Sequence, residues 1–329
     1  MQCLPKWRRA CRVYRRKLSW KGASIVEVML AVKNSGDCVI TARSRLRRYR
    51  LYAALSLLSF AFGCATPSGK EPSPVFPSTP RAAPIGGIDA VLYEFKQVAA
   101  AGVKPRVAVI SAALSSRSRA FEGDVRLFSQ TVSGLNAVAP QIALNNAATL
   151  TNPYEAASKQ NLRAALEALA QTVDPQGLAI VLLSSHGGVS LLEVNSRGQD
   201  LSPLSSFELR TWLEPLGKTK TLIIVSACHS GSFIRTLAAS NRIILTAARA
   251  DRSSFGCNFA SGNTYFIEEM LKVNYSPLAS INDLFLQTKS TVAARELRMR
   301  LSPPSEPQAF IGIDMQADAG KPLQELFKP

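Results

Sequence analysis

The sequence predicts an α/β fold in which a mostly parallel β-sheet lies between helices on both of its faces. Short apolar runs rich in β-branched residues, such as 178–183 and 221–227, indicate strands that are buried on both faces. Segments with the helical spacing of apolar residues, such as 207–216, lie between these runs. Because alternating strands and helices join through right-handed crossovers, the expected architecture is a three-layer sandwich.

Each element follows from a local signal. Asn152 and Pro153 are typical of a helix start, with Asn as the N-cap and Pro in the first turn. A short hairpin arm is expected at 191–194. The expected strands are 106–112, 141–144, 178–183, 221–227, 242–247 and 308–313. The expected helices are 89–101, 121–138, 152–173, 207–216, 233–238, 264–273 and 281–297.

Two of the strands lead into residues that carry chemistry. The run 221–227 leads into Cys228, and the run 178–183 is followed closely by His186. Ligands bind at the carboxyl ends of strands in an open α/β sheet, and neighbouring parallel strands lie about 4.8 Å apart. We therefore expect the Cys228 thiol and the His186 imidazole to meet. A base within reach of a thiol raises the share of thiolate at neutral pH.

The residues beside this pair allow a catalytic and a structural interpretation. The chain has two histidines, and His229 directly follows Cys228, where adjacent side chains usually point apart, so His186 is the better base. Gly187 and Gly188 leave backbone N–H groups open to an incoming carbonyl, as an oxyanion hole requires. The alternatives are a packed structural thiol at Cys228 and a structural turn at His186 and Gly187.

Three sequence blocks together resemble a known family, the legumain-type cysteine peptidases of peptidase family C13, which share the caspase-like fold. The blocks are the strand ending in His-Gly, the strand ending in Ala-Cys-His-Ser-Gly, and the run Ile-Ile-Leu-Thr-Ala-Ala-Arg-Ala-Asp-Arg-Ser-Ser-Phe-Gly-Cys at 243–257. The resemblance covers about residues 105–310. It implies a caspase-like sandwich and endopeptidase activity through a Cys228 and His186 dyad. It also implies an oxyanion hole made by the N–H groups of Gly187 and Cys228.

The substrate pocket is where the resemblance is weakest. The family favours Asn before the cut and reads it with an acid two residues before the Cys, where this chain has Ser226. By resemblance, Arg119 or alternatively Arg117 supplies the basic group. Ser253 and Ser254 match the pocket loop, and Glu268 matches a further acid. Because one carboxylate is missing, the preference for Asn or Asp stays open. Arg119 and Glu268 are equally well ordinary surface charges.

Composition excludes several classes of function. The formal net charge is +16, but residues 1–63 hold 14 Lys and Arg against 2 Asp and Glu. The remainder holds 25 basic and 21 acidic residues, with no basic run interleaved with aromatics, so we expect no nucleic-acid partner. No metal-type Cys/His spacing and no Gly-rich phosphate loop is present, so we expect no metal and no cofactor.

The N-terminal region resembles an export signal. Five arginines in 43–50 precede the apolar run 51–63, which is too short for a comfortable membrane span, and Cys64 follows directly. This order resembles a bacterial lipoprotein signal, in which the cysteine becomes the acylated N-terminus. We therefore expect lipidation at Cys64 and a membrane anchor. The expected location is the bacterial cell envelope, facing the periplasm, with secretion as the alternative.

The regions around the signal complete the expected organisation. Residues 1–63 are expected to form a basic leader and signal. If translation starts near Val39 or Leu46, residues 1–42 are not translated. The Pro- and Ser-rich stretch 64–87 is expected to be a flexible tether, or else a tail without a role. Residues 88–329 are expected to form the peptidase domain.

Two alternative functions come from other classes. One is a catalytically inactive protein that keeps the fold as a peptide-binding or scaffold module. The absent acid at Ser226 favours this alternative slightly, whereas the presence of both Cys228 and His186 argues against it. The other is a thiol redox protein that uses Cys228 and Cys257, which requires their loops to touch. The expected partner of the peptidase is a peptide or protein substrate.

Overall fold

The computed structural model describes residues 92, 95, 102, 104–146, 156–196, 199–258 and 260–329, all within the compact unit Pro77–Pro329. The predicted leader, the lipidation site at Cys64 and the tether lie outside the described residues and stay predictions. Of the helix expected at 89–101, Leu92 and Phe95 are described, and both are helical and buried.

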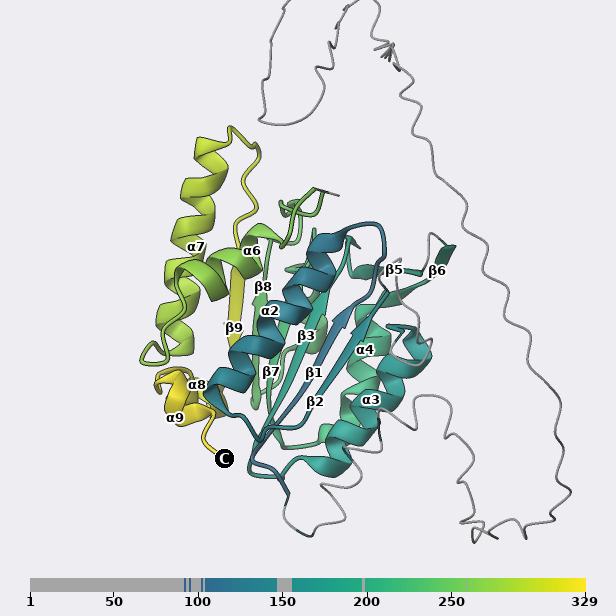
Figure 1. Cartoon of the computed structure of the whole chain (residues 1–329), viewed down its shortest axis with the longest axis vertical. Coiled ribbons are helices and arrows are strands. Elements are labelled where there is room, and N and C mark those ends of the chain that lie inside the picture. The colour runs from purple at the N-terminus through teal and green to yellow at the C-terminus, as the bar shows by residue number, and fades with distance from the viewer. Residues whose placement is uncertain are drawn as a thin grey trace, which may run out of the picture. The chain divides into compact units, whose positions relative to one another are not determined.

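A six-stranded sheet forms the centre of the domain, with the order β2-β1-β3-β7-β8-β9 (Figure 1). The strands are β1 Val107–Ala113, β2 Gln141–Asn145, β3 Leu178–Ser184, β7 Lys220–Ser226, β8 Arg242–Thr246 and β9 Gln308–Ile311. The first five strands in this order are parallel, and β9 runs antiparallel to β8 at the edge. The predicted α/β class and mostly parallel sheet are therefore confirmed.

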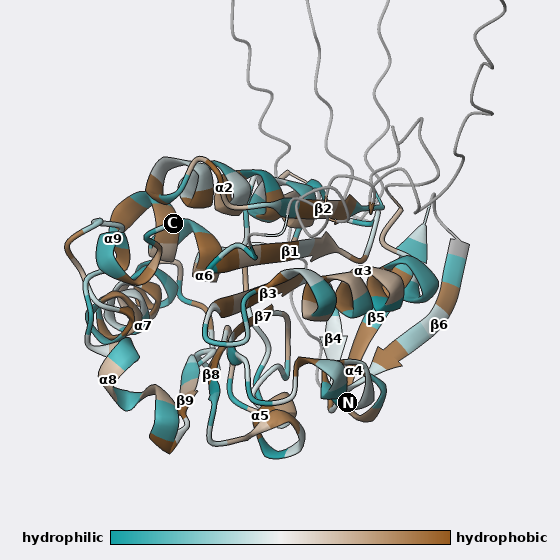
Figure 2. Cartoon of the chain, turned by 90° about the horizontal axis from the view of Figure 1, so that it is seen from below, coloured by the Kyte–Doolittle hydropathy of each residue, from teal (hydrophilic) through white to brown (hydrophobic). Residues whose placement is uncertain are grey.

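Helices cover both faces of this sheet (Figures 1 and 2). One face carries α2 Arg119–Leu135, α6 Tyr265–Glu268 and α7 Ile281–Arg298; the other carries α3 Lys159–Thr172, α4 Ser206–Trp212 and α5 Ser232–Leu237. The remaining short elements are η2 Glu214–Leu216, η3 Glu269–Val273, η4 Ile313–Met315, α8 Gln316–Ala319 and α9 Leu323–Leu326. The three layers expected from the sequence are present.

The central strands are apolar along their whole length because each face of the sheet packs against helices. In β3, Ala179, Val181 and Leu183 belong to the core on the α3 side. The alternate residues of the same strand, Ile180 among them, belong to the core on the α2 side. Burying each such Val, Leu or Ile side chain stabilises the fold by about 1.5–3 kcal/mol. The continuous apolar run in the sequence is thus the mark of a strand covered on both sides.

A second, three-stranded sheet of order β4-β5-β6 follows β3 directly. Its strands are β4 Gly187–Gly188, β5 Leu191–Ser196 and β6 Gln199–Ser205. The predicted hairpin arm at 191–194 is confirmed as β5. Its partner β6 was not predicted, because the Pro and polar residues of 199–205 hide the strand pattern.

Several helix boundaries differ from the prediction: α2 ends at Leu135 instead of 138, α4 ends at Trp212 instead of 216, and two further helices differ more. Residues 156–158 are not helical, and α3 begins at Lys159 with Ser158 as its N-cap, so the predicted start at Asn152 is wrong. The Ala157 N–H instead donates to Asn146 Oδ1 at 2.9 Å, which holds this stretch against the end of β2. The helix predicted over 264–273 changes after one turn of α6 into the wider π-type turn η3.

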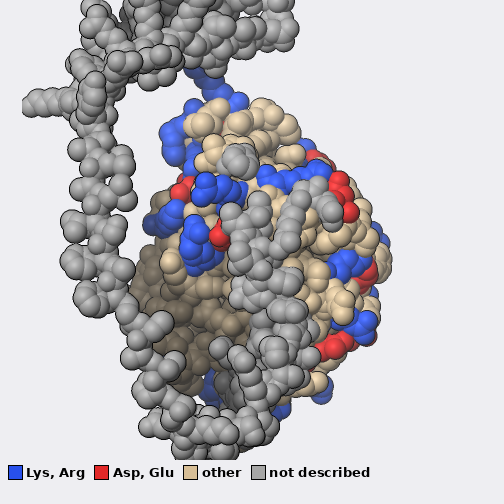
Figure 3. Space-filling model, turned by 45° about the vertical axis from the view of Figure 1, so that its right-hand side comes forward, with Lys and Arg blue, Asp and Glu red and all other residues tan. Residues whose placement is uncertain are grey.

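The surface of the domain mixes charges of both signs. Acidic side chains lie among the basic ones on the face shown in Figure 3. No helix in the described part of the chain is long and apolar enough to span a bilayer. Across the same described ranges, no group of three or more His, Cys, Asp or Glu residues is arranged to hold a metal ion.

Candidate active site

The register between β3 and β7 aligns the two predicted catalytic residues. Ser184 pairs with Ser226 at the carboxyl ends of these adjacent parallel strands, and the Ser185 N–H donates to the Ser226 carbonyl at 3.1 Å. His186 and Cys228 each follow their paired serine by two residues. The two side chains therefore start from corresponding positions at the same edge of the sheet, as the sequence predicted.

Gly187 brings the backbones after the two strands into direct contact. A Cβ atom at this position would lie 2.3 Å from the Cys228 carbonyl oxygen and 2.9 Å from Ala227 Cβ. Only glycine fits at this distance. A Cβ atom on Gly188 would meet nothing within 4 Å, so the constraint acts at Gly187 alone of the two.

The small sheet sets the direction of the Gly187 N–H. The Glu193 N–H donates to the His186 carbonyl at 2.9 Å, and Gly187 pairs with Leu192 in the antiparallel β4–β5 ladder. Because successive residues of an antiparallel strand bond on alternate sides, the N–H of Gly187 points away from β5. The Gly187 N–H is therefore not used by the β4–β5 ladder.

The Cys228 sulfur lies against the loop that follows β8. The Ser254 N–H points at the sulfur at 3.3 Å, and the Ser254 hydroxyl lies at 3.7 Å. When protonated, the thiol donates to the Ser254 carbonyl at 3.6 Å. The predicted pocket loop thus supplies a backbone and a side-chain donor to the sulfur.

Hydrogen bonds to the sulfur lower the pKa of the Cys228 thiol from 9.0 to about 5. The largest cause is a hydrogen bond from the Cys257 thiol; burial acts in the opposite direction, and Ser254 and Ser253 also lower the pKa. The pKa of Cys257 is raised, mainly by the same interaction with Cys228. Both cysteines are free thiols in this structure. The interaction between the two thiols therefore favours the thiolate at Cys228 and the protonated thiol at Cys257.

His186 and His229 lie in different surroundings. The His186 ring packs edge-on against Phe121 of α2, with ring centroids 4.9 Å apart and an interplanar angle of 88°. His229 adopts a left-handed backbone (φ 56°), and its Nδ1 lies 3.0 Å from the Ala250 carbonyl. His229 is thus engaged with the loop after β8.

Asp124, which no sequence motif indicated, is fully buried beneath the strand ends. Its Oδ2 accepts hydrogen bonds from Ser184 at 2.7 Å, Thr264 at 2.8 Å and Ser226 at 3.5 Å. Burial raises the pKa of this carboxyl from 3.8 to about 7, against the effect of its hydrogen bonds. The available signal was an acidic residue on the apolar face of the predicted helix, between Phe121 and Val125.

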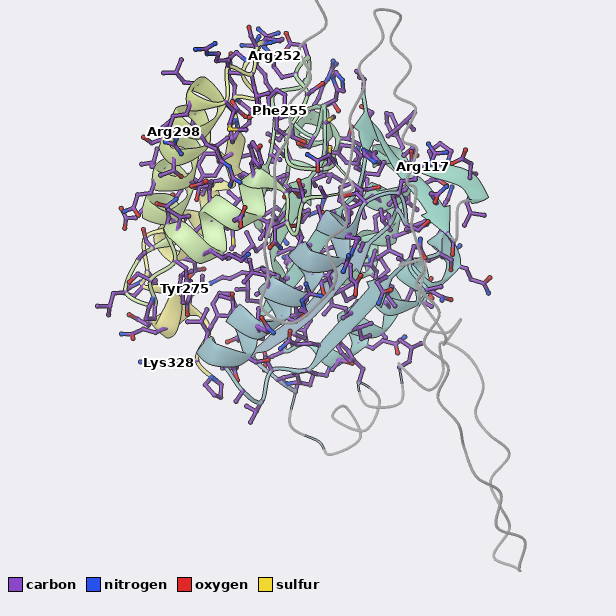
Figure 4. All side chains as sticks on the ribbon, turned by 45° about the horizontal axis from the view of Figure 1, so that its top comes forward. Arg117, Arg252, Phe255, Tyr275, Arg298 and Lys328 are labelled. Atoms are coloured by element: carbon purple, nitrogen blue, oxygen red, sulfur yellow. The ribbon has the colours of Figure 1, made fainter. Side chains whose placement is uncertain are left out.

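The basic candidates of the pocket differ in how they are engaged. Arg117 donates to both oxygens of Asp200 at 2.8 Å, and its guanidinium lies 3.6 Å from Glu193. Arg119 is exposed at the first position of α2. Figure 4 shows Arg117 on the β5–β6 side and Arg252 on the other side of the same end of the sheet. Arg119 is the candidate with the freer guanidinium, and its role stays a prediction.

The remaining pocket candidates have diverse positions. Ser226 is buried, and its hydroxyl lies 2.8 Å from Thr264 Oγ1. Ser253 is exposed, whereas Ser254 is buried against the sulfur. Glu268 accepts from Lys272 at 3.2 Å and Arg295 at 3.0 Å, within the helical layer of α6 and α7. These ion pairs fit the alternative of a structural charge at Glu268, and the substrate roles of all four residues stay predictions.

A cavity of about 390 Å³ lies at the opposite end of the sheet, where β1, β3 and β7 begin. Its lining includes Arg106, Lys220, Asp318 and Lys321. Lys220 and Lys321 both pair with Asp318, at 2.6 and 2.7 Å. This cavity is separate from the strand ends that lead into His186 and Cys228.

The fold and the site together define a class of protein: an α/β protein with a free cysteine after one central strand and a histidine after the neighbouring strand. A cysteine nucleophile and its acid–base partner require such a pairing. The model of the Peptidase C13 family matches residues 158–315, which include both residues. The match confirms the resemblance of the sequence to this family.

The family match begins at residue 158, so Arg117, Arg119 and Asp124 lie outside the matched range. A comparison with curated proteins finds no match. Among solved structures, caspase-1 from Spodoptera frugiperda is similar, with 14% sequence identity and a TM-score of 0.44. That similarity covers 63% of this chain and 87% of the caspase chain.

Proposed function

We propose that this protein is a cysteine endopeptidase in which Cys228 is the nucleophile and His186 the acid–base residue. The observation that carries the proposal is the alignment of these residues beyond paired strand ends, combined with the lowered pKa of Cys228. A thiolate, not a thiol, is the nucleophile in such reactions. The Peptidase C13 match over both residues supports the same function.

The proposed reaction is acyl transfer in two steps. The Cys228 sulfur forms a bond to the peptide carbonyl carbon, and the carbonyl oxygen becomes an oxyanion held by the N–H groups of Gly187 and Cys228. As the oxyanion collapses, the C–N bond breaks and the leaving nitrogen takes a proton from the His186 imidazolium. Water then gives a proton to His186 and attacks the thioester, which releases the acid and restores the thiolate. Attack by an amine instead of water would make a new peptide bond.

The specificity we propose is for an uncharged or acidic residue, Asn or Asp, before the cut. Ser226 adds no charge where the family pattern has an acid, and the buried Asp124 already accepts bonds from three hydroxyl groups. Arg119, exposed at the start of α2, is the proposed partner of the substrate side chain. A cation that faces the substrate side chain favours Asp at least as much as Asn.

The test is cleavage of a peptide library by the full chain, with product masses identifying the residue before each cut. We expect cleavage by the wild type and by His229→Asn, because Asn tolerates the left-handed backbone of His229. We expect none by Cys228→Ala, and a loss of at least about 100-fold in His186→Ala. No cleavage by the wild type, together with an ordinary thiol pKa, would instead indicate an inactive binding module.

The N-terminal anchor is part of the same proposal. We propose that Cys64 is acylated and that the peptidase works at the cell envelope, facing the periplasm. The sequence order of arginines, short apolar run and cysteine supports this proposal. Partition of the mature protein into detergent, with loss of that partition in Cys64→Ala, is the expected result. A mature protein that still carries residues 1–42 would refute it.

A further inference from the structure

A single carboxylate lies behind the two strand ends that lead into the candidate dyad. Asp124 is on α2 and has no exposed surface. Its Oδ2 accepts from the hydroxyls of Ser184, which ends β3, and Ser226, which ends β7. The two hydroxyls are aimed at one oxygen atom from neighbouring strands.

The same carboxylate also holds the segment that follows the pocket loop. Oδ1 of Asp124 accepts from the Thr264 N–H at 2.9 Å and from Asn263 Nδ2 at 3.3 Å. The Thr264 hydroxyl donates to Oδ2 at 2.8 Å and is the N-cap of α6. Asp124 therefore ties three segments together: the ends of β3 and β7, and the end of the loop that contains Ser254 and Cys257.

Further contacts from the same helix face reach the site. Phe121, one turn before Asp124, packs against the His186 ring. Phe121 and Val125 form a buried cluster with Cys257 packed against it. Residues 121, 124 and 125 lie on one face of α2, so one rigid helix contacts the histidine, both strand ends and the loop behind the thiol.

We propose that Asp124 is a positioning residue that sets the relative placement of His186 and Cys228. This inference rests on the proposed peptidase function. Each tethered serine precedes its catalytic residue by two positions, at most about 7 Å of chain. A displacement at the carboxylate is therefore passed on to both catalytic side chains. A misplacement of about 1 Å can cost about 100-fold in rate.

The composition of the strands supports this role. β3 is Leu-Ala-Ile-Val-Leu-Leu-Ser, and its one residue with a hydroxyl group, Ser184, is the residue that bonds to Asp124. Burying a carboxylate is unfavourable unless it is fully hydrogen-bonded, so an apolar residue would serve better for packing alone. Five N–H and O–H groups from three segments lie within hydrogen-bonding distance of Asp124, and one of them, the Ser226 hydroxyl, is shared with Thr264 Oγ1 at 2.8 Å.

The experiment compares Asp124→Asn with Glu122→Gln, a matched control on the partly exposed side of the same helix. For the full chain, the readouts are kcat and KM on a cleaved peptide, and the pH profile of Cys228 alkylation. We expect Asp124→Asn to lower kcat about 10-fold or more with little change in KM. We also expect its alkylation midpoint to rise, because the donors to the sulfur loosen. Glu122→Gln should match the wild type.

The direction of the shift separates the possible roles. A purely structural role would leave the alkylation midpoint of Asp124→Asn at the wild-type value; that result, or a lower midpoint, overturns the proposal. If Asp124→Asn does not fold, the Ser184→Ala, Ser226→Ala double variant removes the strand tethers instead. Ser226→Thr, which keeps the hydroxyl, should restore kcat relative to Ser226→Ala. Wild-type kcat and midpoint in the double variant would overturn the proposal.

Failure of the peptidase function remains distinguishable from failure of this inference. A wild-type chain that cleaves no peptide contradicts the proposed function. The alkylation profile still reports the environment of the Cys228 sulfur in that case. An unchanged profile in Asp124→Asn then contradicts the positioning role on its own.

Discussion

The ionisation of Cys228 gives the most direct test of the site, through the substitution Cys257→Ala. The Cys257 thiol is the largest cause of the lowered pKa of Cys228, about 5 instead of 9.0. Removing this donor leaves Ser254 and Ser253, while burial still disfavours the thiolate. We expect the alkylation midpoint of the wild type to lie near pH 5, and that of Cys257→Ala to move toward the ordinary thiol value.

The magnitudes decide which measurement is informative. At pH 7 a thiol of pKa 5 is about 99% thiolate, whereas one of pKa 9 is about 1% thiolate, a gain of about 100-fold. Nucleophilicity falls with basicity, with a Brønsted slope of about 0.4–0.5, so four pKa units cost about 40- to 100-fold per thiolate. The two effects nearly cancel at pH 7. The labelling rate at neutral pH is therefore a poor test, and the position of the pH midpoint is the good one.

The assay follows alkylation by iodoacetamide between pH 4 and 10, measured by intact mass. The chain has six cysteines, so the same series on Cys228→Ala defines the background. Cys257→Ser is the matched control, because its hydroxyl can still donate to the sulfur, and we expect its midpoint to stay well below that of Cys257→Ala. A wild-type midpoint above pH 8, or identical midpoints in the wild type and Cys257→Ala, would refute the reasoning.

Three further predictions concern packing and pH. A Cβ on Gly187 would lie 2.3 Å from a backbone oxygen, so Gly187→Ala should lower kcat/KM at least about 10-fold, whereas Gly188→Ala, which meets nothing, should not. Within α2, Gly134→Ala should add about 0.5–1 kcal/mol to the free energy of unfolding, measured in urea. Gly123→Ala, whose Cβ would lie 1.7 Å from an opposing carbonyl oxygen, should lower the free energy of unfolding. Equal changes in Gly134→Ala and Gly123→Ala would contradict the packing. Folding raises the pKa of Asp124 from 3.8 to about 7. The resulting contribution of Asp124 to the free energy of unfolding is therefore full below pH 3.8 and is lost as the pH rises to about 7. At about 1.4 kcal/mol per pH unit, the free energy of unfolding of the wild type should fall by up to about 4 kcal/mol more than that of Asp124→Asn over this pH range. The same pH dependence of urea unfolding in both proteins would contradict this prediction.

The six strands of the central sheet could be predicted from the sequence to within one or two residues. Strands such as β3 and β7 are buried on both faces, so continuous apolar runs in the sequence indicate them directly. The order of the two runs and their endings also predicted that His186 and Cys228 follow the ends of neighbouring strands, as the β3–β7 pairing has them. Parallel strands place their carboxyl ends at one edge, so this inference needed only that β3 and β7 be neighbours.

Features that depend on tertiary contacts could not be predicted in this way. The start of α3 is set by bonds between Ala157 and the end of β2, which override the local signal at Asn152. Asp124 acts through donors that are 60, 102 and 140 positions away in the sequence. No local pattern distinguishes such an acid from a solvated one on a helix.

The details around the thiol bear on the choice between an enzyme and a binding module of the same fold. A binding module needs the pocket but gains nothing from a thiolate, and a buried thiolate without a function is a desolvation penalty. Here Cys257 and Ser254 both direct donors at the Cys228 sulfur. A binding module also has no need for the close approach at Gly187, which restricts that position to glycine. These arrangements are each explained by stabilising a reactive sulfur beside its partner loop, so they favour the enzyme over the scaffold.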